Sequence, residues 1–268
     1  MVYDKCPRQL YLTYKVKRPS VQSEEQYSAY ALGGIAFHGA ISEQIGRWSR
    51  GDEIDIEMAK TRVKQFIYRC YSHPEKTLFE IANGYKLPDN ICEATLINTL
   101  KNVNNFFLFI WPRFVGHTYV LHECLERFEV CGAKVLVKID LCTIDTEGRL
   151  VITDWKTGLS SRIQDNYWQM ATYALWASYV RKEKPENIIL QIVNVKMGSF
   201  DLMEPIERDY ESVTGKIRAE ISLWQDNTTL GRYNPTPDIH RCQGCVHLIG
   251  CAEGRSLVDD NNQEGISE

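Results

Sequence analysis

The sequence predicts a mixed α/β (α+β) fold, in which a mixed central sheet is flanked by helices and a helical lobe lies near the N-terminus. Three observations predict this class. Residues up to 116 have mainly helical periodicity, residues 118–154 read as successive strands, and the remainder alternates helix with strand. A chain of 268 residues can bury a full core, as one large domain or as one domain with an inserted lobe.

The N-terminal half reads as helices. Residues 24–48 carry apolar side chains at helical spacing, and Gly33 and Gly34 indicate a bend or a close approach within that segment. Residues 55–71 and 91–111 have the same period. Together these segments predict one long helix followed by a helical lobe.

The pattern changes at Thr118, where segments typical of strands begin. The expected strands are residues 118–130, 134–144, 150–154, 188–195 and 200–203. Residues 145–148 form a hairpin turn between two of them. Helices are expected at residues 165–181 and 206–226. A meander, a helix, further strands and a helix together predict the mixed sheet and its flanking layers.

Charge and hydropathy narrow the class of function. The formal net charge is −4 at pH 7, so the chain has no global basic field, which argues against a protein that coats nucleic acid passively. The charge does not argue against an enzyme with a local groove, because bound metal ions supply positive charge at a site. No run approaches about 18 apolar residues, and the N-terminus lacks the apolar region of a signal peptide, so a cytoplasmic location is expected.

The stretch Asp154-Trp155-Lys156 indicates chemistry most directly. It ends an apolar strand, in which residues i and i+2 point to the same face, so Asp154 and Lys156 reach one cleft while Trp155 faces the other way. Asp140 ends the strand-like run of residues 134–139 within another expected strand. Two carboxylates can hold a hard divalent cation, and a lysine can orient a water or stabilise charge on a phosphate. The pattern predicts a metal-dependent phosphodiesterase site.

The cysteines indicate a second metal centre. Nine cysteines are many for a chain expected in the cytosol, where disulfides are rare. Cys242, Cys245 and Cys251 lie within ten residues of one another and can wrap one centre, with Cys6 beside Pro7 as a fourth thiolate. Such thiolates select zinc, copper(I) or iron–sulfur clusters.

A zinc site is the alternative, in which His247 or His240 takes the place of Cys6. Zinc ribbons usually use two C-x-x-C knuckles, however, and this sequence has one such pair. The remaining cysteines lie in apolar periodic segments and are expected to be small buried hydrophobes: Cys70, Cys92, Cys124, Cys131 and Cys142.

Two predicted helices contribute further candidate site residues. His38 follows Phe37 in the first long helix, although a lone helix histidine is more often packed or solvated than a metal ligand. Gln169 and Tyr173 follow the D-x-K strand and are four residues apart, so they share a helix face. That face can lie over the active site, although an ordinary amphipathic helix gives the same spacing.

These motifs have a characteristic order along the chain. They are G-x-x-x-H at residues 34–38, G-x(7)-D at 132–140, D-x-K-T-G at 154–158 and Q-x-x-x-Y at 169–173. This order resembles the RecB-like branch of the PD-(D/E)XK nucleases. The N-terminal Y-x-x-C-P-R-x-x-Y motif and the C-terminal cysteine triplet resemble its iron–sulfur version, which includes CRISPR-associated exonucleases and AddB-type nuclease domains. The resemblance covers residues 3–251 and is poorest in the helical lobe.

The resemblance implies a restriction-endonuclease-like fold and a set of site residues. Mg²⁺ or Mn²⁺ would be bound by His38, Asp140, Asp154 and the backbone carbonyl of Trp155. Lys156 would be the catalytic lysine. The helix residues Gln169 and Tyr173 would support that lysine or contact DNA.

The resemblance also implies that Cys6, Cys242, Cys245 and Cys251 hold a [4Fe-4S] cluster. Shared ligation would close a long loop and join the two ends of the chain, so we expect a structural role for the cluster. The regions then expected are a cluster ligand and His-bearing helix (1–50), an inserted helical lobe (51–116), the nuclease core (117–230), the iron–sulfur segment (231–255) and a disordered tail (256–268).

The function implied is that of a metal-dependent deoxyribonuclease, an exonuclease that hydrolyses phosphodiester bonds at single-stranded DNA ends. The alternative is a non-catalytic or partner-dependent DNA-binding subunit of a larger DNA-processing complex. The intact set of acids, histidine and lysine argues for catalysis, whereas the acidic pI and the lobe at residues 51–116 are compatible with a protein partner. No membrane partner is expected.

Overall fold

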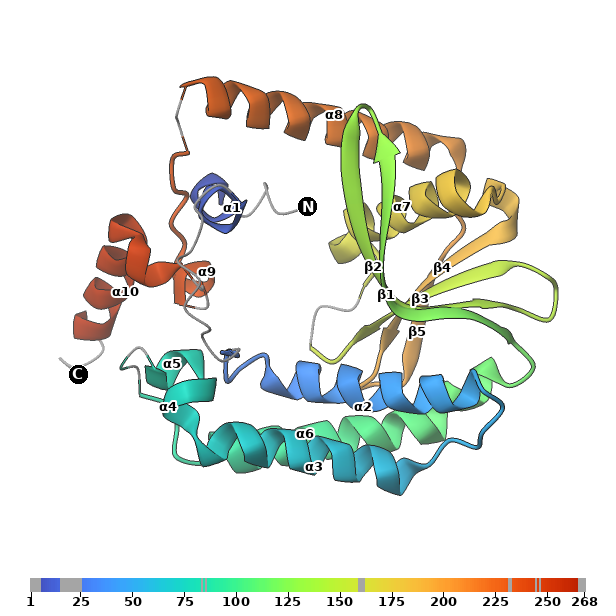
Figure 1. Ribbon diagram of the computed structural model, residues 1–268, viewed down its shortest axis with the longest axis horizontal. Coiled ribbons are helices and arrows are strands. Elements are labelled where there is room, and N and C mark those ends of the chain that lie inside the picture. Colours follow the sequence, from blue (N-terminus) through green and yellow to red (C-terminus); the bar gives the residue numbers. More distant parts are fainter. Residues whose placement is uncertain are drawn as a thin grey trace. The chain divides into compact units, whose positions relative to one another are not determined.

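The computed structural model describes residues 6–14, 26–82, 84, 86–158, 162–230, 233–243, 245 and 247–264. The chain divides into two compact units, Glu25–Lys216 and a second unit that combines Met1–Glu24 with Ile217–Glu268. The predicted mixed α/β class is confirmed, because helices flank a five-stranded mixed sheet (Figure 1). Within the described residues, no helix is both long and apolar enough to cross a membrane.

The larger unit is built on one sheet. In spatial order its strands are β1 (Thr118–Val130), β2 (Ala133–Ile144), β3 (Leu150–Lys156), β4 (Ile188–Asn194) and β5 (Ser199–Met203). Neighbouring strands run antiparallel except β3 and β4, which are parallel. Parallel strands need a crossover connection. It consists of the 3₁₀ turn η3 (Gln164–Asn166), α7 (Tyr167–Trp176), the π-helical turn η4 (Ala177–Arg181) and the 3₁₀ turn η5 (Pro185–Asn187).

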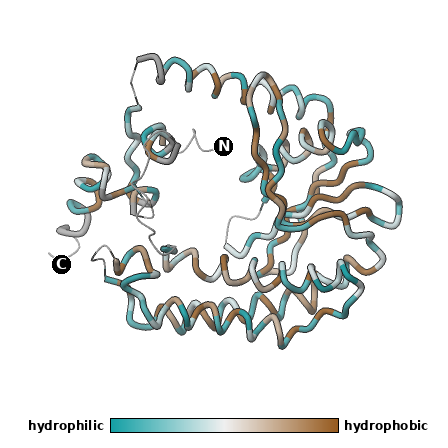
Figure 2. The backbone as a smooth tube through the Cα atoms, in the orientation of Figure 1, coloured by the Kyte–Doolittle hydropathy of each residue, from teal (hydrophilic) through white to brown (hydrophobic). Residues whose placement is uncertain are grey.

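A helical layer covers one face of this sheet. It contains α2 (Leu32–Trp48), α3 (Ile56–Ser72), α4 (Pro74–Thr77), α5 (Phe79–Ala82), α6 (Ile91–Asn105), the π-helical η1 (Phe106–Ile110) and the 3₁₀ turn η2 (Trp111–Phe114). The buried sides of α2, α3 and α6 share one hydrophobic core with Leu141, Trp155 and Val193 of the sheet. Figure 2 shows the hydrophobic residues along the central strands. The helices predicted at residues 51–116 therefore belong to the core of the larger unit.

The long N-terminal helix starts later than predicted. The sequence pattern places its beginning at residue 24, whereas α2 begins at Leu32. The backbone of Tyr27 is bonded instead to Thr77 and Phe79, forming an isolated parallel bridge with Leu78. In this approach Ala29 is buried and Tyr27 is partly buried, but by a bridge and a turn, which hydrophobic spacing alone does not distinguish from a helix.

The two faces of β3 have different partners. Trp155 is 2% exposed and its ring meets those of Phe106 and Phe114, with centroids 5.4 and 5.6 Å away. Asp154 and Lys156 point to the opposite face, where Gln169 of α7 binds both side chains. The predicted separation of Trp155 from its two neighbours is thus confirmed.

The second unit joins both ends of the chain. Its helices are α1 (Pro7–Tyr14), the end of α8 (Glu207–Leu230), α9 (Ile239–Gln243), the 3₁₀ turn η6 (Leu248–Gly250) and α10 (Ala252–Glu264). The Arg8 Nε donates a 2.7 Å hydrogen bond to the Tyr233 carbonyl, and the Tyr11 ring stacks on the Tyr233 ring at 4.3 Å. Helix α10 occupies much of the segment for which the sequence predicts a disordered tail, and its Val258 is 2% exposed. Residues 265–268 of that tail lie outside the described residues.

Candidate active site

The candidate active site lies where β2 and β3 separate. Their pairing ends with Leu141 opposite Thr153, and the next residues are Asp140 and Asp154. The Asp140 Oδ2 accepts a 2.8 Å hydrogen bond from the Trp155 backbone N–H, which gives that donor a partner beyond the end of the ladder. Asp140 is 6% exposed and Asp154 is 3% exposed. The strands thus bring two nearly buried carboxylates to one point.

Asp154 and Lys156 share a face, as predicted. The Lys156 Nζ lies 2.7 Å from Asp154 Oδ2, and the other carboxylate oxygen, Oδ1, accepts a 2.7 Å hydrogen bond from Gln169 Nε2. Oδ2 is buried and accepts no well-directed hydrogen bond, so its only close partner among the described residues is the lysine charge. A buried carboxylate oxygen in this state has capacity for a further cationic ligand.

Helix α7 fixes the position of Lys156. The lysine Nζ donates to Gln169 Oε1 at 3.0 Å, and Gln169 Nε2 donates to the Tyr173 hydroxyl at 2.7 Å. That hydroxyl donates to the Lys138 backbone carbonyl on β2 at 2.5 Å. Burial, followed by the Asp154 charge, raises the pKa of Tyr173, so the phenol remains a donor at neutral pH. The predicted shared face of Gln169 and Tyr173 is confirmed.

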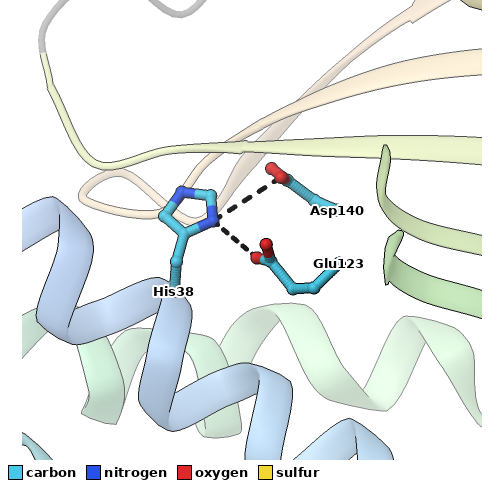
Figure 3. A group of neighbouring side chains, drawn as sticks. All are labelled: His38, Glu123 and Asp140. Carbon is cyan, nitrogen blue, oxygen red and sulfur yellow. Dashed lines mark hydrogen bonds and ion pairs between the residues drawn. The ribbon is translucent and has the colours of Figure 1, made fainter. Parts of the chain in front are cut away.

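His38 reaches the same carboxylates from α2. Its Nδ1 lies 3.0 Å from Glu123 Oε1 and 3.6 Å from Asp140 Oδ1, so three elements converge on one point (Figure 3). Within the described part of the chain, these three residues form a group whose possible ligand atoms all lie within 4.8 Å of one another. The structure therefore brings together His38 and Asp140 as predicted and adds Glu123.

Glu123 was not predicted from the sequence. It occupies β1 between two residue pairs, His122–Leu141 and Cys124–Ile139, opposite Asp140. Its φ is +42°, in the left-handed region that non-glycine residues rarely adopt, and the β1 register shifts nearby between Tyr119 and Leu121. Such irregularities redirect a side chain beside active sites. An alternating strand pattern contains no sign of this local departure, so spacing alone could not have identified Glu123.

The electrostatics reflect crowding of negative charge. Burial raises the pKa of Asp140 to about 7, and the Asp154 and Glu123 charges act in the same direction. Burial lowers the pKa of His38, but the hydrogen bond with Glu123 and the nearby carboxylate charges outweigh it, so the net pKa is raised. Protons are therefore retained between these side chains, and a divalent cation can replace them.

Glu123 is held ionised by its neighbours. Burial opposes ionisation, but hydrogen bonds from His38 and Lys138 lower its pKa overall. The Lys138 Nζ lies 2.6 Å from Glu123 Oε2 and is more than half exposed at its side chain. A second lysine, Lys138 of β2, therefore contacts the acidic group in addition to Lys156 of β3.

Two adjoining cavities open onto these side chains. One, of about 550 Å³, is lined by Asp154, Trp155, Lys156 and Gln169 together with His38, Lys138, Asp140 and Thr157. The other, of about 660 Å³, shares the last four residues and extends along α2. The site residues thus line a connected recess that solvent and a ligand can reach.

The donors present fit a divalent cation. Carboxylate oxygens and imidazole nitrogen are ligands for Mg²⁺ and Mn²⁺. His38, Glu123 and Asp140 supply a compact group, and Asp154 adds the buried Oδ2 described above. The predicted ligation by the Trp155 carbonyl stays a prediction, although Trp155 lines the same cavity.

The four cysteines predicted as cluster ligands lie in the second unit. A Cβ at Gly254 would lie 3.5 Å from the sulfurs of both Cys242 and Cys251. Burial raises the pKa of Cys245, and the charges of the other three thiolates act in the same direction, Cys6 included. The two ends of the chain therefore bring these thiols near one another.

The other cysteines and the alternative histidines have different environments. Cys70 and Cys142 are buried as predicted, Cys92 and Cys124 are partly buried, and the prediction is wrong for Cys131, which is exposed at the β1–β2 turn. His247 is 9% exposed, whereas the side chain of His240 lies outside the described residues.

An antiparallel β1–β2–β3 meander with a parallel β4, with Asp140 on β2 beside Asp154 and Lys156 at the end of β3, is the arrangement of a restriction-endonuclease-like fold. The family model of the PD-(D/E)XK nuclease superfamily matches residues 1–252. The chain therefore belongs to the PD-(D/E)XK nuclease superfamily. A comparison with curated proteins found no match.

Proposed function

We propose that this nuclease is a metal-dependent deoxyribonuclease that hydrolyses single-stranded DNA from its ends. One observation supports this proposal most. Asp140, Asp154 and Lys156 lie at the same recess as the His38–Glu123 pair. The preference for single-stranded ends rests on the resemblance to RecB-like exonucleases.

His38, Asp140 and Asp154 would hold Mg²⁺ or Mn²⁺, with the Trp155 carbonyl as a further ligand and Glu123 within reach. A cation bound there lowers the pKa of a coordinated water and polarises a phosphate oxygen. Glu123 fixes the His38 ring through their 3.0 Å contact, as carboxylates commonly orient metal-binding histidines.

Lys156 has a role that follows from its contacts. Its ammonium neutralises Asp154 at 2.7 Å in the structure described here. Gln169 holds the ammonium independently of Asp154, so the lysine would keep its position with a cation at that oxygen. There it can orient a water and stabilise charge that develops on the phosphate.

We further propose that Cys6, Cys242, Cys245 and Cys251 hold a [4Fe-4S] cluster with a structural role. Zinc ribbons usually use two C-x-x-C pairs, whereas this chain has the single pair Cys242 and Cys245. That pattern supports a cluster over a single zinc ion.

The test of the nuclease is degradation of end-labelled single-stranded DNA with Mn²⁺. Lys156→Ala should lower the rate at least about 100-fold, because a positioned charge stabilises the transition state. Lys134→Ala is the matched control, since Lys134 is an exposed lysine on β2. Circular single-stranded DNA should resist cleavage. Equal rates for wild type and Lys156→Ala would exclude this site, and wild-type binding without hydrolysis would favour a DNA-binding subunit.

A further inference from the structure

Helix α2 contains an unusual number of glycines for a buried helix. They are Gly33, Gly34, Gly39 and Gly46. Glycine lowers helix stability relative to alanine, so each interior glycine calls for a physical reason. A Cβ at Gly33 would lie 2.8 Å from Thr99 Oγ1, and one at Gly34 would lie 3.2 Å from Thr157 Oγ1. Close approach of neighbouring elements therefore explains the first two glycines.

Among the residues that the structure describes, no such contact explains Gly39. A Cβ there would meet none of their atoms within 4 Å, and the residue is exposed. It directly follows His38 and lines the cavity of about 660 Å³ that adjoins the acidic residues. A glycine at the wall of a recess permits close approach of a ligand.

The same cavity is lined by both ionisable and apolar residues. The ionisable ones are His38, Glu123, Lys138 and Asp140. Tyr30, Ala31 and Ile35 precede His38 in the chain and line the cavity too, and Tyr30 is 72% exposed. An exposed aromatic ring beside a charged site is a suitable platform for a nucleobase, whose faces stack on aromatic rings.

We propose that this cavity binds the nucleoside next to the phosphate held at the acidic site, with its base stacked on Tyr30 and its sugar passing over Gly39. The proposal rests on the proposed nuclease function. Continuity between the two cavities selects this occupant, because a phosphate at Asp140 places the adjoining sugar and base in the neighbouring recess. A base in a duplex is already stacked, so the subsite selects an unpaired nucleotide.

Affinity for single-stranded DNA provides a test that does not depend on cleavage. Ca²⁺ replaces Mn²⁺, and dissociation constants are measured for a series of labelled oligonucleotides. Each carries one abasic position, placed successively further inward from each end. At one position the affinity of the wild type should fall roughly 5–100-fold, the range expected for one stacked base. Tyr30→Ala should bind the normal and abasic oligonucleotides equally at that position, whereas Tyr30→Phe should keep the wild-type difference.

Gly39 is tested against another glycine of the same helix. Gly39→Leu should weaken oligonucleotide binding at least about tenfold, because its side chain fills the path of the sugar. Gly46 is the control position, since a Cβ there meets its nearest atoms at 3.6 Å and it does not line the cavity. Gly46→Ala should bind DNA like the wild type, and melting temperatures verify that both variants fold.

The outcomes separate this proposal from the nuclease function. An abasic penalty that is the same in wild type and Tyr30→Ala, or unchanged binding by Gly39→Leu, overturns the nucleoside subsite even when wild type degrades DNA. Conversely, loss of the abasic penalty in Tyr30→Ala supports the subsite, and the Mn²⁺ assay with Lys156→Ala then decides catalysis independently.

Discussion

Burial of the Asp140 carboxyl, which the site needs, lowers the free energy of unfolding of the protein at neutral pH. Asp140 is 6% exposed, and burial raises the pKa of its carboxyl to about 7, whereas an aspartate in an unfolded chain titrates near pH 3.9. Between these pH values the folded state holds a proton that the unfolded state lacks. The free energy of unfolding of the metal-free protein therefore decreases as pH rises through this window.

Asp140→Asn removes this titration while keeping an oxygen that accepts from the Trp155 N–H. In the presence of EDTA at pH 8, we expect the variant to melt at least about 2–4 °C above the wild type, which corresponds to about 1 kcal/mol for a domain of this size. The difference in melting temperature should shrink near pH 4, where the folded state holds Asp140 in its neutral form and the asparagine side chain of the variant is neutral as well. Calorimetry at the two pH values measures it, and a variant less stable than wild type at pH 8 contradicts the account.

Glu123 is the site residue that the sequence could not identify. Asp154 with Lys156, and Gln169 with Tyr173, were predictable because regular strand and helix periods place each pair on one face. Glu123 reaches the site through a left-handed residue in an irregular strand, and that irregularity depends on the paired strands rather than on local spacing. Sequence spacing alone likewise does not identify any other ligand that a β-bulge places in a site.

Glu123→Gln should weaken Mn²⁺ binding about 10–100-fold, the range found when a partner that orients a metal-binding histidine is changed. The negative charge that attracts the cation is lost, and so is the strong acceptor for His38. Titration calorimetry measures the affinity. Glu129→Gln, an exposed change on the same strand, serves as the control. Equal Mn²⁺ affinities for Glu123→Gln and wild type would remove Glu123 from the site.

At the scale of elements, the strands were predicted most closely. The expected strands at residues 118–130, 134–144 and 150–154 differ from β1, β2 and β3 by two residues at most. Their alternating pattern and hairpin turn are local signals. The start of α2 and the helix α10 were not predicted. The bridge and turn before α2 carry apolar residues at helical spacing, and α10 is a mainly polar segment in which Val258 is buried.

The packing of α2 against α6 gives a prediction for one element. Gly33→Ala should lower the free energy of unfolding by about 1–3 kcal/mol, because its Cβ would lie 2.8 Å from Thr99 Oγ1 and the helices would have to shift. Gly46→Ala, in the same helix with ordinary contacts, should instead raise it by about 0.5–1 kcal/mol. Urea unfolding compares the two. Stabilisation by both alanines would show that α2 and α6 are not closely packed at Gly33.

At the scale of the whole molecule, the two ends of the chain form one unit. The contacts of Arg8 and Tyr11 with Tyr233 join segments more than 200 residues apart in sequence, and the cysteines of both ends belong to this unit. The sequence indicated this joining only through the pattern of cysteines. Ligation across so long a loop stabilises a fold by restricting the unfolded chain.

A [4Fe-4S] cluster in this unit predicts a brown protein with broad visible absorbance. Cys242→Ser should remove most of that absorbance and lower the melting temperature, because the two ends lose their shared ligand. Cys131→Ser is the matched control, since Cys131 is exposed in the larger unit. Absorbance spectra, together with iron and zinc analysis, decide between an iron–sulfur cluster and a zinc site. A colourless protein with one zinc ion per chain would contradict the cluster.

One divalent cation should lie among His38, Asp140 and Asp154. A crystal soaked in Mn²⁺ tests this most directly, because the ion can be located by its anomalous scattering. We expect one strong peak in the recess between β2 and β3, within bonding distance of the Asp140 and Asp154 oxygens and the His38 imidazole. That peak should be absent in Asp140→Asn. An ordered Mn²⁺ elsewhere, with none at this recess in the wild type, would contradict the account.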